Sequence, residues 1–205
     1  RARVGRRPVI ESLPYGKPVE IGGVRVSLHP PGHVLGSAQV RVEYRGEVWV
    51  ASGDYKLQPD PTCTPFEPVR CDVFITESTF GLPIYRWPKP EAVFDELNAW
   101  WRGNASMGVT SIVLGYSLGK AQRLLAGLDP SIGPILVHEA VDELLPAFRE
   151  RGVVLPEVRC ATPDTVHDAR GRAMVVMPPG AAGPTECGWG GPTVTALASG
   201  WMRVR

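Results

Sequence analysis

Apolar and polar residues alternate through much of the first 80 positions, which is the two-residue period of a half-buried β-strand. Residues 19–28 alternate around a Gly-Gly pair, and residues 39–44 and 47–51 flank an Arg-Gly pair. Both arrangements predict β-hairpins, because glycine adopts the backbone angles that a tight turn requires. An apolar run over residues 71–76 follows a proline-rich loop and predicts a buried strand.

The pattern changes between residues 80 and 90. Residues 90–101 begin with proline and repeat apolar residues at the i, i+3, i+4 spacing of one helix face. Further helices are predicted over residues 120–128 and 141–151. Short apolar runs predict buried strands at four places, residues 111–114, 135–137, 173–177 and 194–198. Alternating strands and helices predict a parallel sheet covered on both faces, so a β-rich part is followed by an α/β part.

Composition narrows the function classes only slightly. The 205 residues have a formal net charge of +1, which gives no electrostatic argument for nucleic acid. The sequence has no apolar run of membrane-spanning length and shows no signal peptide. Its cysteines form no CxxC pair, and we expect reduced thiols in a cytoplasmic protein: Cys63, Cys71, Cys160 and Cys187.

Three candidate metal ligands each follow a strand-like run. His33 lies in a turn bounded by glycines, Asp54 follows Ser-Gly, and Glu77 follows the apolar run that ends near residue 75. Imidazole and carboxylate groups bind zinc, and a carboxylate can bridge two metal ions. The three residues therefore predict part of a dinuclear site at one sheet edge. Such a site takes about five to seven ligands, and no histidine-rich cluster supplies the others.

Each candidate also has a structural interpretation. His33 by itself fits a loop histidine that caps nearby carbonyl groups, and Asp54 fits an Asx turn. Glu77, which Ser78 and Thr79 follow, fits an N-cap, although a carboxylate buried after an apolar run needs a partner.

The loop over residues 115–120 joins a strand to a helix, as phosphate-binding loops do. Ser117 and Lys120 are therefore candidate substrate-binding residues, but the loop lacks a Walker A ending and also fits an ordinary βα turn. The other histidines have weaker signals. His29 is expected to orient a neighbouring group, His138 to end a strand, and His167 to lie in a polar loop.

Taken in order, these segments resemble the metallo-β-lactamase fold and, within it, the β-CASP nucleases. Gly-His-Val-Leu-Gly-Ser-Ala at 32–38 resembles the third metal motif of that family, and Ser-Gly-Asp at 52–54 resembles the fourth. Thr-Glu-Ser-Thr-Phe-Gly at 76–81 resembles the first motif of the β-CASP region, and residues 114–122 resemble the strand and helix that follow. Ser-Gly-Trp-Met at 199–202 resembles a segment of one bacterial branch, the ligase-associated DNA exonucleases.

The resemblance implies an α/β (α+β mixed) fold, part of a metallo-β-lactamase αββα sandwich with an inserted α/β β-CASP domain. Residues 1–80 would form the metallo-β-lactamase portion, 81–190 the β-CASP domain, and 191–205 a return to the first portion.

The resemblance also implies residue roles. Two Zn²⁺ ions would activate a water for phosphodiester hydrolysis. His33 and Asp54 would be metal ligands, with Asp54 bridging both ions. Glu77 would orient a histidine that protonates the leaving oxygen.

The family's His-x-His-x-Asp-His cluster and its two later histidine motifs are absent from this sequence. We therefore expect a piece of a longer protein, inactive alone. The intact protein is predicted to be a cytoplasmic, zinc-dependent DNA exonuclease of DNA repair. Its predicted partners are nucleic acid, DNA rather than RNA, together with DNA ligase and a helicase, and it would not associate with a membrane.

Three alternatives remain open. An RNA-processing β-CASP ribonuclease would have the same site, and a non-catalytic α/β binding protein would explain the missing ligands. A small-molecule hydrolase of the lactamase fold is disfavoured, because it would not need the α/β region between residues 91 and 177.

Overall fold

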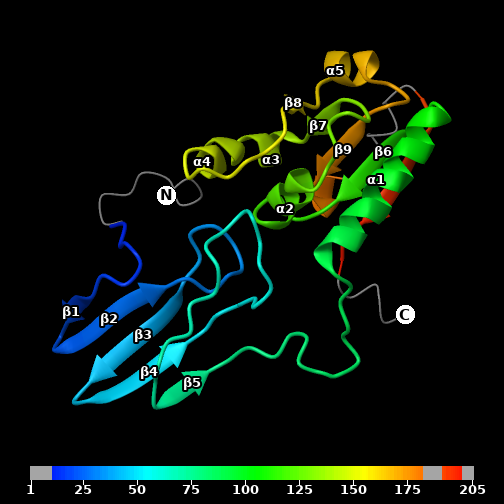
Figure 1. Ribbon diagram of the computed structural model, residues 1–205. Coiled ribbons are helices and arrows are strands. Elements are labelled where there is room, and N and C mark those ends of the chain that lie inside the picture. The colour runs from blue at the N-terminus through cyan, green and yellow to red at the C-terminus, as the bar shows by residue number, and fades with distance from the viewer. Residues whose placement is uncertain (1–10, 182–190, 200–205) are drawn as a thin grey trace. The chain divides into compact units, whose positions relative to one another are not determined.

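The computed structural model describes residues 11–181 and 191–199. The chain divides into two compact units, Arg1–Leu82 and Pro83–Arg205, and each contains one five-stranded sheet (Figure 1).

The first unit is a mixed sheet whose strands are ordered β1-β2-β3-β4-β5. The first four strands are antiparallel neighbours, and β5 lies parallel to β4. The predicted hairpin turns are present, because Gly22, Gly23, Arg45 and Gly46 all have positive φ. The strand bounds are β1 Val19–Ile21, β2 Val24–His29, β3 Gln39–Tyr44, β4 Glu47–Ala51 and β5 Val73–Ile75.

One face of this sheet is almost entirely apolar. The register places Val26, Val42, Trp49 and Val73 beside one another across four strands, and their i±2 neighbours share that face. We call this set the apolar face: Val19, Ile21, Val24, Val26, Leu28, Val40, Val42, Trp49, Ala51, Val73 and Ile75. The opposite face is mostly polar but also carries Val48, Phe74 and Val50, and Val50 is fully buried.

Strand β5 corrects one prediction. The run over residues 71–76 was expected to be buried, yet Phe74 is 43% and Ile75 52% exposed. The physical reason is twofold: β5 is the last strand of its sheet, and the face that Ile75 shares is exposed on β4 as well, where Trp49 is 45% exposed.

The second unit is an α/β layer structure on a fully parallel sheet, ordered β10-β6-β9-β7-β8. Its strands are β6 Thr110–Leu114, β7 Ile135–Val137, β8 Arg159–Cys160, β9 Met174–Met177 and β10 Thr193–Leu197. Its helices are α1 Pro90–Ser106, α2 Lys120–Ala126, α3 Glu139–Asp142, α4 Leu145–Arg149 and α5 Pro163–Asp168, with a 3₁₀ turn at Pro179–Ala181.

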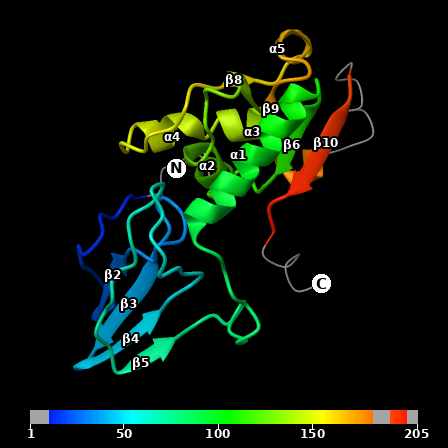
Figure 2. The ribbon, with the colours of Figure 1, turned by 45° about the vertical axis from the view of Figure 1, so that its right-hand side comes forward.

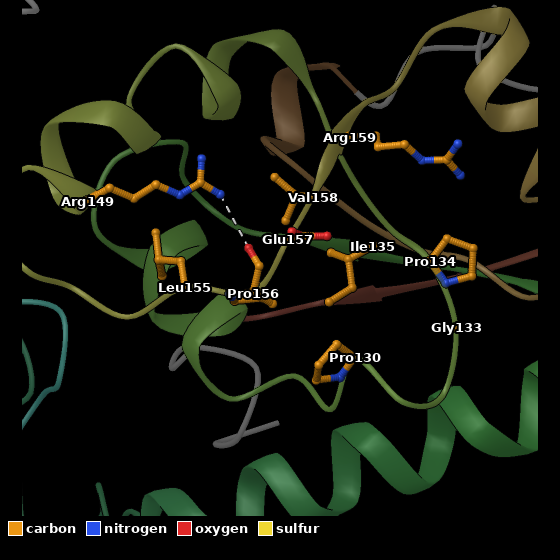
Figure 3. Close-up of a pocket in the computed structure, with 10 residues that line it drawn as sticks. All are labelled: Pro130, Gly133, Pro134, Ile135, Arg149, Leu155, Pro156, Glu157, Val158 and Arg159. Carbon is orange, nitrogen blue, oxygen red and sulfur yellow. Dashed lines mark hydrogen bonds between the residues drawn. The ribbon is translucent and has the colours of Figure 1, made fainter.

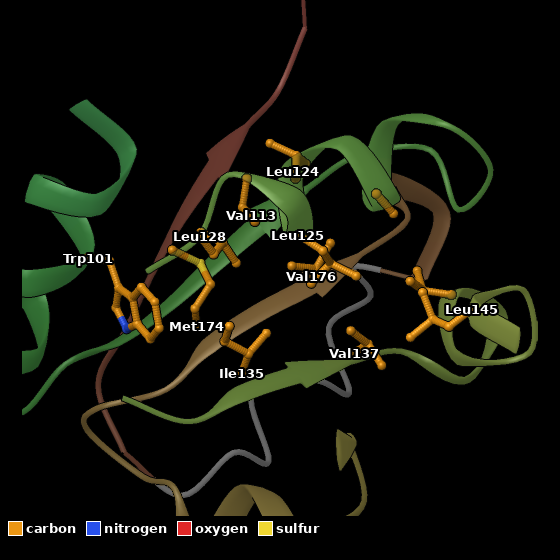
Figure 4. Close-up of a cluster of buried hydrophobic side chains, with 12 residues drawn as sticks. Trp101, Val113, Leu124, Leu125, Leu128, Ile135, Val137, Leu145, Met174 and Val176 are labelled. Carbon is orange, nitrogen blue, oxygen red and sulfur yellow. The ribbon is translucent and has the colours of Figure 1, made fainter. Parts of the chain in front are cut away.

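Alternate strand residues in this unit enter two separate cores. On one face, Val113, Val137 and Val176 pack with side chains from α1 to α4, including Trp101 and Leu125 (Figure 4). The other face carries Ile112, Leu136 and Val175, with Val166 of α5 packed against them. Burial on both faces explains why these strands read as continuous apolar runs.

Strand β10 corrects a second prediction. Residues 191–205 were expected to return to the first portion, but Thr193–Leu197 pairs in parallel with all of β6, at the edge of the second sheet (Figure 2). Backbone bonds from Thr110 N to Pro192 O and from Ala198 N to Leu114 O continue the ladder at both ends. Residues 200–205, and with them most of the 199–202 segment, lie outside the described residues.

Two helical predictions also need correction. The helix expected over residues 141–151 is two short helices, α3 and α4. Pro146 lies in the first turn of α4 and has no N–H to continue the ladder from α3. Helix α5 was missed, although Pro163 opens it and Thr162 and Thr165, on either side of that proline, form its capping box.

Candidate functional site

Three loops of the first unit meet at one edge of its sheet. Because β2, β4 and β5 run in the same direction, their carboxyl ends lie at the same edge. Hydrogen bonds link the loops that follow: Ser52 N donates to Ile75 O at 2.9 Å, and Lys56 N donates to Pro31 O at 2.9 Å. The segments that carry His33 and Asp54 are therefore neighbours through the backbone.

The structure brings His33 and Asp54 together. His33 Nε2 lies 3.9 Å from Asp54 Oδ2, and the two side chains are 43% and 70% exposed. Zinc binds nitrogen and oxygen ligands at about 2.0–2.2 Å, so one ion can reach both atoms after a small side-chain adjustment. The pair faces solvent and is open to an incoming ion.

Glu77 belongs to the loop that follows β5. Its carboxylate accepts a hydrogen bond from Thr79 N, as an N-cap-like turn does. The hydrogen bonds from Thr79 are the largest influence on its pKa and lower it, and the nearby His33 imidazole lowers it further. The shift favours the ionised carboxylate of Glu77, which is close enough to His33 to interact with it electrostatically.

These residues fit one side of a zinc site. Imidazole nitrogen and carboxylate oxygen are suitable zinc donors, but a catalytic zinc usually has three protein ligands. Among the residues that the structure describes, no group of three His, Cys, Asp or Glu side chains could hold a metal ion. The first unit thus supplies two converging donors and leaves the coordination incomplete.

A buried ion pair supports the loop after Asp54. Lys56 Nζ contacts Asp60 Oδ2, and Asp60 also accepts hydrogen bonds from Thr62 N and Thr62 Oγ1. Burial raises the pKa of Asp60, but the hydrogen bonds from Lys56 and Thr62 outweigh it and hold the pKa below its ordinary value. Sequence analysis missed this pair, because a Lys and an Asp four residues apart in a loop carry no distinctive signal.

His29 lies beneath the same edge. Its Nδ1 is 3.0 Å from Glu67 Oε1, and its Nε2 is 3.0 Å from Ser27 Oγ. The imidazole thus joins the end of β2 to the loop that precedes β5.

Ser117 and Lys120 belong to the second unit, in the loop between β6 and α2. Lys120 Nζ donates to Ala198 O at 2.9 Å and lies over the Tyr116 ring at 5.4 Å. Burial, and to a lesser extent Arg123, lowers its pKa. Ser117 O accepts from the buried Gln122 side chain at 2.9 Å. In this structure both residues help to build the loop, and their substrate-binding role stays a prediction.

The other histidines have local contacts. His138 caps α3, its Nδ1 accepting from Ala140 N at 3.1 Å. His167 was expected in a polar loop but lies in the last turn of α5, where Nδ1 is 2.8 Å from an Arg170 nitrogen. Cys71 and Cys160 are free thiols, Cys63 is half-buried, and Cys187 lies outside the described residues.

The second unit has a depression of about 770 Å³ (Figure 3). Ile135 and Arg159, which begin β7 and β8, line it with Arg149, whose guanidinium donates to Pro156 O at 3.3 Å. It therefore lies at the amino ends of the strands, whereas ligands of open α/β sheets bind outside the carboxyl ends.

Comparison with known proteins places this geometry in context. The chain is 30% identical over 162 residues to a probable DNA ligase of Opitutus terrae, a match that covers 78% of this chain and 16% of that protein. It is 34% identical over 128 residues to endoribonuclease ysh-1 of Neurospora crassa, covering 60% of this chain and 14% of that protein. It is 32% identical over 122 residues to cleavage and polyadenylation specificity factor 73 of Drosophila melanogaster, covering 58% of this chain and 18% of that protein. No protein-family model matches the sequence.

A solved structure supports the fold alone. The crystal structure of a protein of unknown function from Enterococcus faecalis matches with a TM-score of 0.57 at 14% identity, over 82% of this chain and 44% of that one. The mixed α/β fold, with two five-stranded sheets of the kind expected for a metallo-β-lactamase and β-CASP region, is thereby confirmed.

The chain is distantly similar to β-CASP endoribonucleases and to a ligase-associated protein, so the predicted relationship is confirmed at that level. It spans between 14% and 18% of the length of the three curated relatives. No helix in the described part of the chain is long and apolar enough to cross a membrane.

Proposed function

We propose that this chain is part of a zinc-dependent phosphodiesterase of the β-CASP type that degrades DNA from an end and works alongside DNA ligase. The observation that carries the proposal is the 3.9 Å approach of His33 Nε2 to Asp54 Oδ2, on two segments that resemble metal motifs in the order expected for the family. The match to a probable DNA ligase, over 78% of the chain, favours DNA and a role in DNA repair. A helicase is a further proposed partner, and the cytoplasm the proposed location.

Each residue has a proposed task. His33 and Asp54 would hold zinc, which supplies Lewis acidity that lowers the pKa of a bound water. Asp54, with two carboxylate oxygens, can contact two ions. Hydrogen bonds from Thr79 lower the pKa of Glu77, and its carboxylate can accept a hydrogen bond from an imidazole N–H and fix that ring. The remaining ligands of the proposed two-zinc site would come from parts of the protein outside these 205 residues.

The first test is metal content and nuclease activity. The 205-residue chain should bind zinc weakly and leave end-labelled DNA intact, because it offers two ligands where a catalytic zinc usually has three. The longer gene product should bind about two zinc ions and degrade DNA from an end. His33→Ala and Asp54→Ala should abolish both properties, while the control His167→Ala, on α5, should change neither. Full zinc content and cleavage in the Asp54→Ala protein would remove the assignment.

RNA is the second candidate substrate, because the endoribonuclease relatives match 58–60% of the chain. Matched single-stranded and double-stranded DNA and RNA oligonucleotides, each labelled at one end, separate the two. Faster loss of terminal nucleotides from DNA supports the proposal, and internal cuts in RNA support the alternative.

A further inference from the structure

One buried side chain lies behind the His33 loop and has no role in the proposed chemistry. Gln39, at the start of β3, is fully buried. Its Nε2 donates to Pro30 O at 3.1 Å and to Glu67 O at 2.6 Å. Both neighbours are carbonyl groups, which accept only, so the amide nitrogen must face them. Gln39 therefore joins the residue that opens the His33 loop to the segment that precedes β5.

The orientation of Gln39 leaves its own oxygen without a partner. Oε1 is the one buried side-chain nitrogen or oxygen, in the part of the chain that the structure describes, that has no hydrogen bond. An unsatisfied buried oxygen is destabilising. An apolar side chain of similar shape would remove that unpaired oxygen, but it would also take away the donor to Glu67 O and one of the two donors to Pro30 O. The two carbonyl groups that it holds are the feature that requires an amide.

Further contacts fix the same short segment. Pro30 O also accepts from Glu67 N at 3.1 Å, and Pro31 O accepts from Lys56 N at 2.9 Å. Gly32 has φ +70°, and a Cβ placed there would lie 2.3 Å from Lys56 O. The backbone before His33 is thus pressed against the loop that follows Asp54, in a conformation that glycine permits.

The far end of the loop is tied separately. Tyr15 Oη donates to Ser37 O at 2.5 Å. Ser37 in turn closes a local turn, with its N and Oγ both donating to Val34 O. His33 therefore lies between two anchored points, Pro30 to Gly32 on one side and Val34 to Ser37 on the other.

We propose that Gln39 is a positioning residue for His33: its amide holds Pro30 O and Glu67 O so that the imidazole stays opposite Asp54. This inference rests on the proposed function, because it assumes that His33 binds zinc. Residues that orient a ligand from behind typically change metal affinity by about 10–100-fold when they are replaced.

The test compares two buried glutamines. Gln39→Met keeps the shape and removes the donor. Gln122→Met is the matched control, since Gln122 is also fully buried and also holds a loop, through Ser117 O and Gly119 N, but in the second unit. Zinc is titrated into each 205-residue protein up to millimolar concentration, and the His33 ring resonances are followed by NMR. Backbone amide exchange is measured on the same samples.

Gln39→Met should raise the zinc dissociation constant at His33 about tenfold or more. It should also speed exchange at the Lys56 and Glu67 amides, which donate to Pro31 O and Pro30 O. Gln122→Met should leave the zinc dissociation constant and the exchange rates of the Lys56 and Glu67 amides unchanged, and it should speed exchange at the Gly119 amide. Tyr15→Phe, a milder variant that frees the far end of the loop, should weaken zinc binding by a smaller factor.

The outcomes separate the two proposals. If zinc leaves the His33 resonances of the wild-type chain unmoved, the ligand assignment fails, and the positioning role falls with it. If zinc moves His33 equally at equal concentrations in wild type, Gln39→Met and Tyr15→Phe, the ligand assignment stands and the positioning role is wrong. If Gln39→Met fails to fold, Tyr15→Phe decides: unchanged zinc affinity in that variant overturns the claim that the anchored loop positions His33.

Discussion

The two sheets have the same number of strands but bury their apolar residues very differently. In the second unit Leu136, Val137, Val175 and Val176 have no exposed surface. In the described part of the first unit, Val50 is the one hydrophobic residue that counts as buried. On the apolar face of the first sheet, Ile21 is 63%, Trp49 45% and Ile75 52% exposed.

The hydrophobic cores that stabilise the molecule lie in the second unit, whereas the candidate metal ligands lie in the first. The second unit has two hydrophobic cores, one on each face of its sheet. The first unit positions His33 and Asp54 through strand pairing, positive-φ glycines and buried polar contacts. Core substitutions should therefore act most strongly in the second unit, and polar or glycine substitutions in the first.

The largest expected effect is a core truncation in the second unit. Leu125→Ala, at a fully buried position of α2, should lower the free energy of unfolding of that unit by about 2–5 kcal/mol. Val50→Ala is the counterpart in the first unit and should cost roughly 1.5 kcal/mol, from the loss of two carbon groups. Urea denaturation with amide exchange resolved for each unit measures both, and a larger loss for Val50→Ala would contradict the contrast.

The next effect concerns the Asp60 ion pair. Asp60→Asn should destabilise the first unit by about 1.5–3 kcal/mol, because it removes hydrogen bonds to a charged, buried group. The pKa of Asp60 is lowered in the folded state, so its contribution is present above the unfolded pKa of about 3.9 and is lost as pH falls through the lower, folded value.

Urea midpoints of the first unit between about pH 2 and 7 should therefore fall with acid in the wild type and fall less in Asp60→Asn. Asp129→Asn, an exposed carboxylate of the second unit, is the control and should leave the first unit's profile unchanged. Identical profiles for the wild type and Asp60→Asn would show that the pair does not stabilise the fold.

A pair of glycines gives a third comparison. Gly32→Ala and Gly46→Ala both force alanine into positive φ, at +70° and +85°. Only the alanine at position 32 meets backbone, 2.3 Å from Lys56 O, whereas nothing lies within 4 Å at position 46. Gly32→Ala should therefore be less stable by about 1–3 kcal/mol, the usual penalty of overpacking. Thermal unfolding measures the difference. Equal losses of stability in the two variants would mean that the backbone around position 32 shifts to accommodate the added Cβ at little cost.

The smallest expected effect is at Lys120. Lys120→Met removes the hydrogen bond to Ala198 O and should cost about 0.5–1.5 kcal/mol. Exchange should quicken at the Ala198 amide, which extends the ladder between β10 and β6. Arg102→Met, which breaks an exposed pair with Asp129, should cost less and leave that amide unaffected.

Local patterns predicted most of the strands and the long helix. The hairpins of the first unit carry their turn chemistry in adjacent residues, so a few positions suffice to predict them. The convergence of His33 and Asp54 followed from strand direction, because both residues come after strands that end at one edge. Their metal-binding role remains a prediction.

The misses depend on information that lies far away in the chain. Strand β10 pairs with β6, which precedes it by about eighty residues, and its composition fits the edge of either sheet. The exposure of β5 depends on which strands surround it, not on its own apolar run. Gln39 occupies a polar position of an alternating strand, where a solvent-exposed side chain would be expected. Only the folded structure shows that it is buried and contacts Pro30 and Glu67.

The central position of β9 has a consequence for synthesis on the ribosome. Strand β9 separates β6 from β7 and bonds to both, yet it follows them in the chain. Until Met177 leaves the exit tunnel, the nascent β6 and β7 lack the strand that pairs with both. Their apolar side chains therefore have no complete sheet and core in which to be buried. A nascent chain stalled before Met174 would therefore expose apolar side chains and unpaired strand edges. Holdase chaperones should retain it longer than a chain stalled after β9 has emerged.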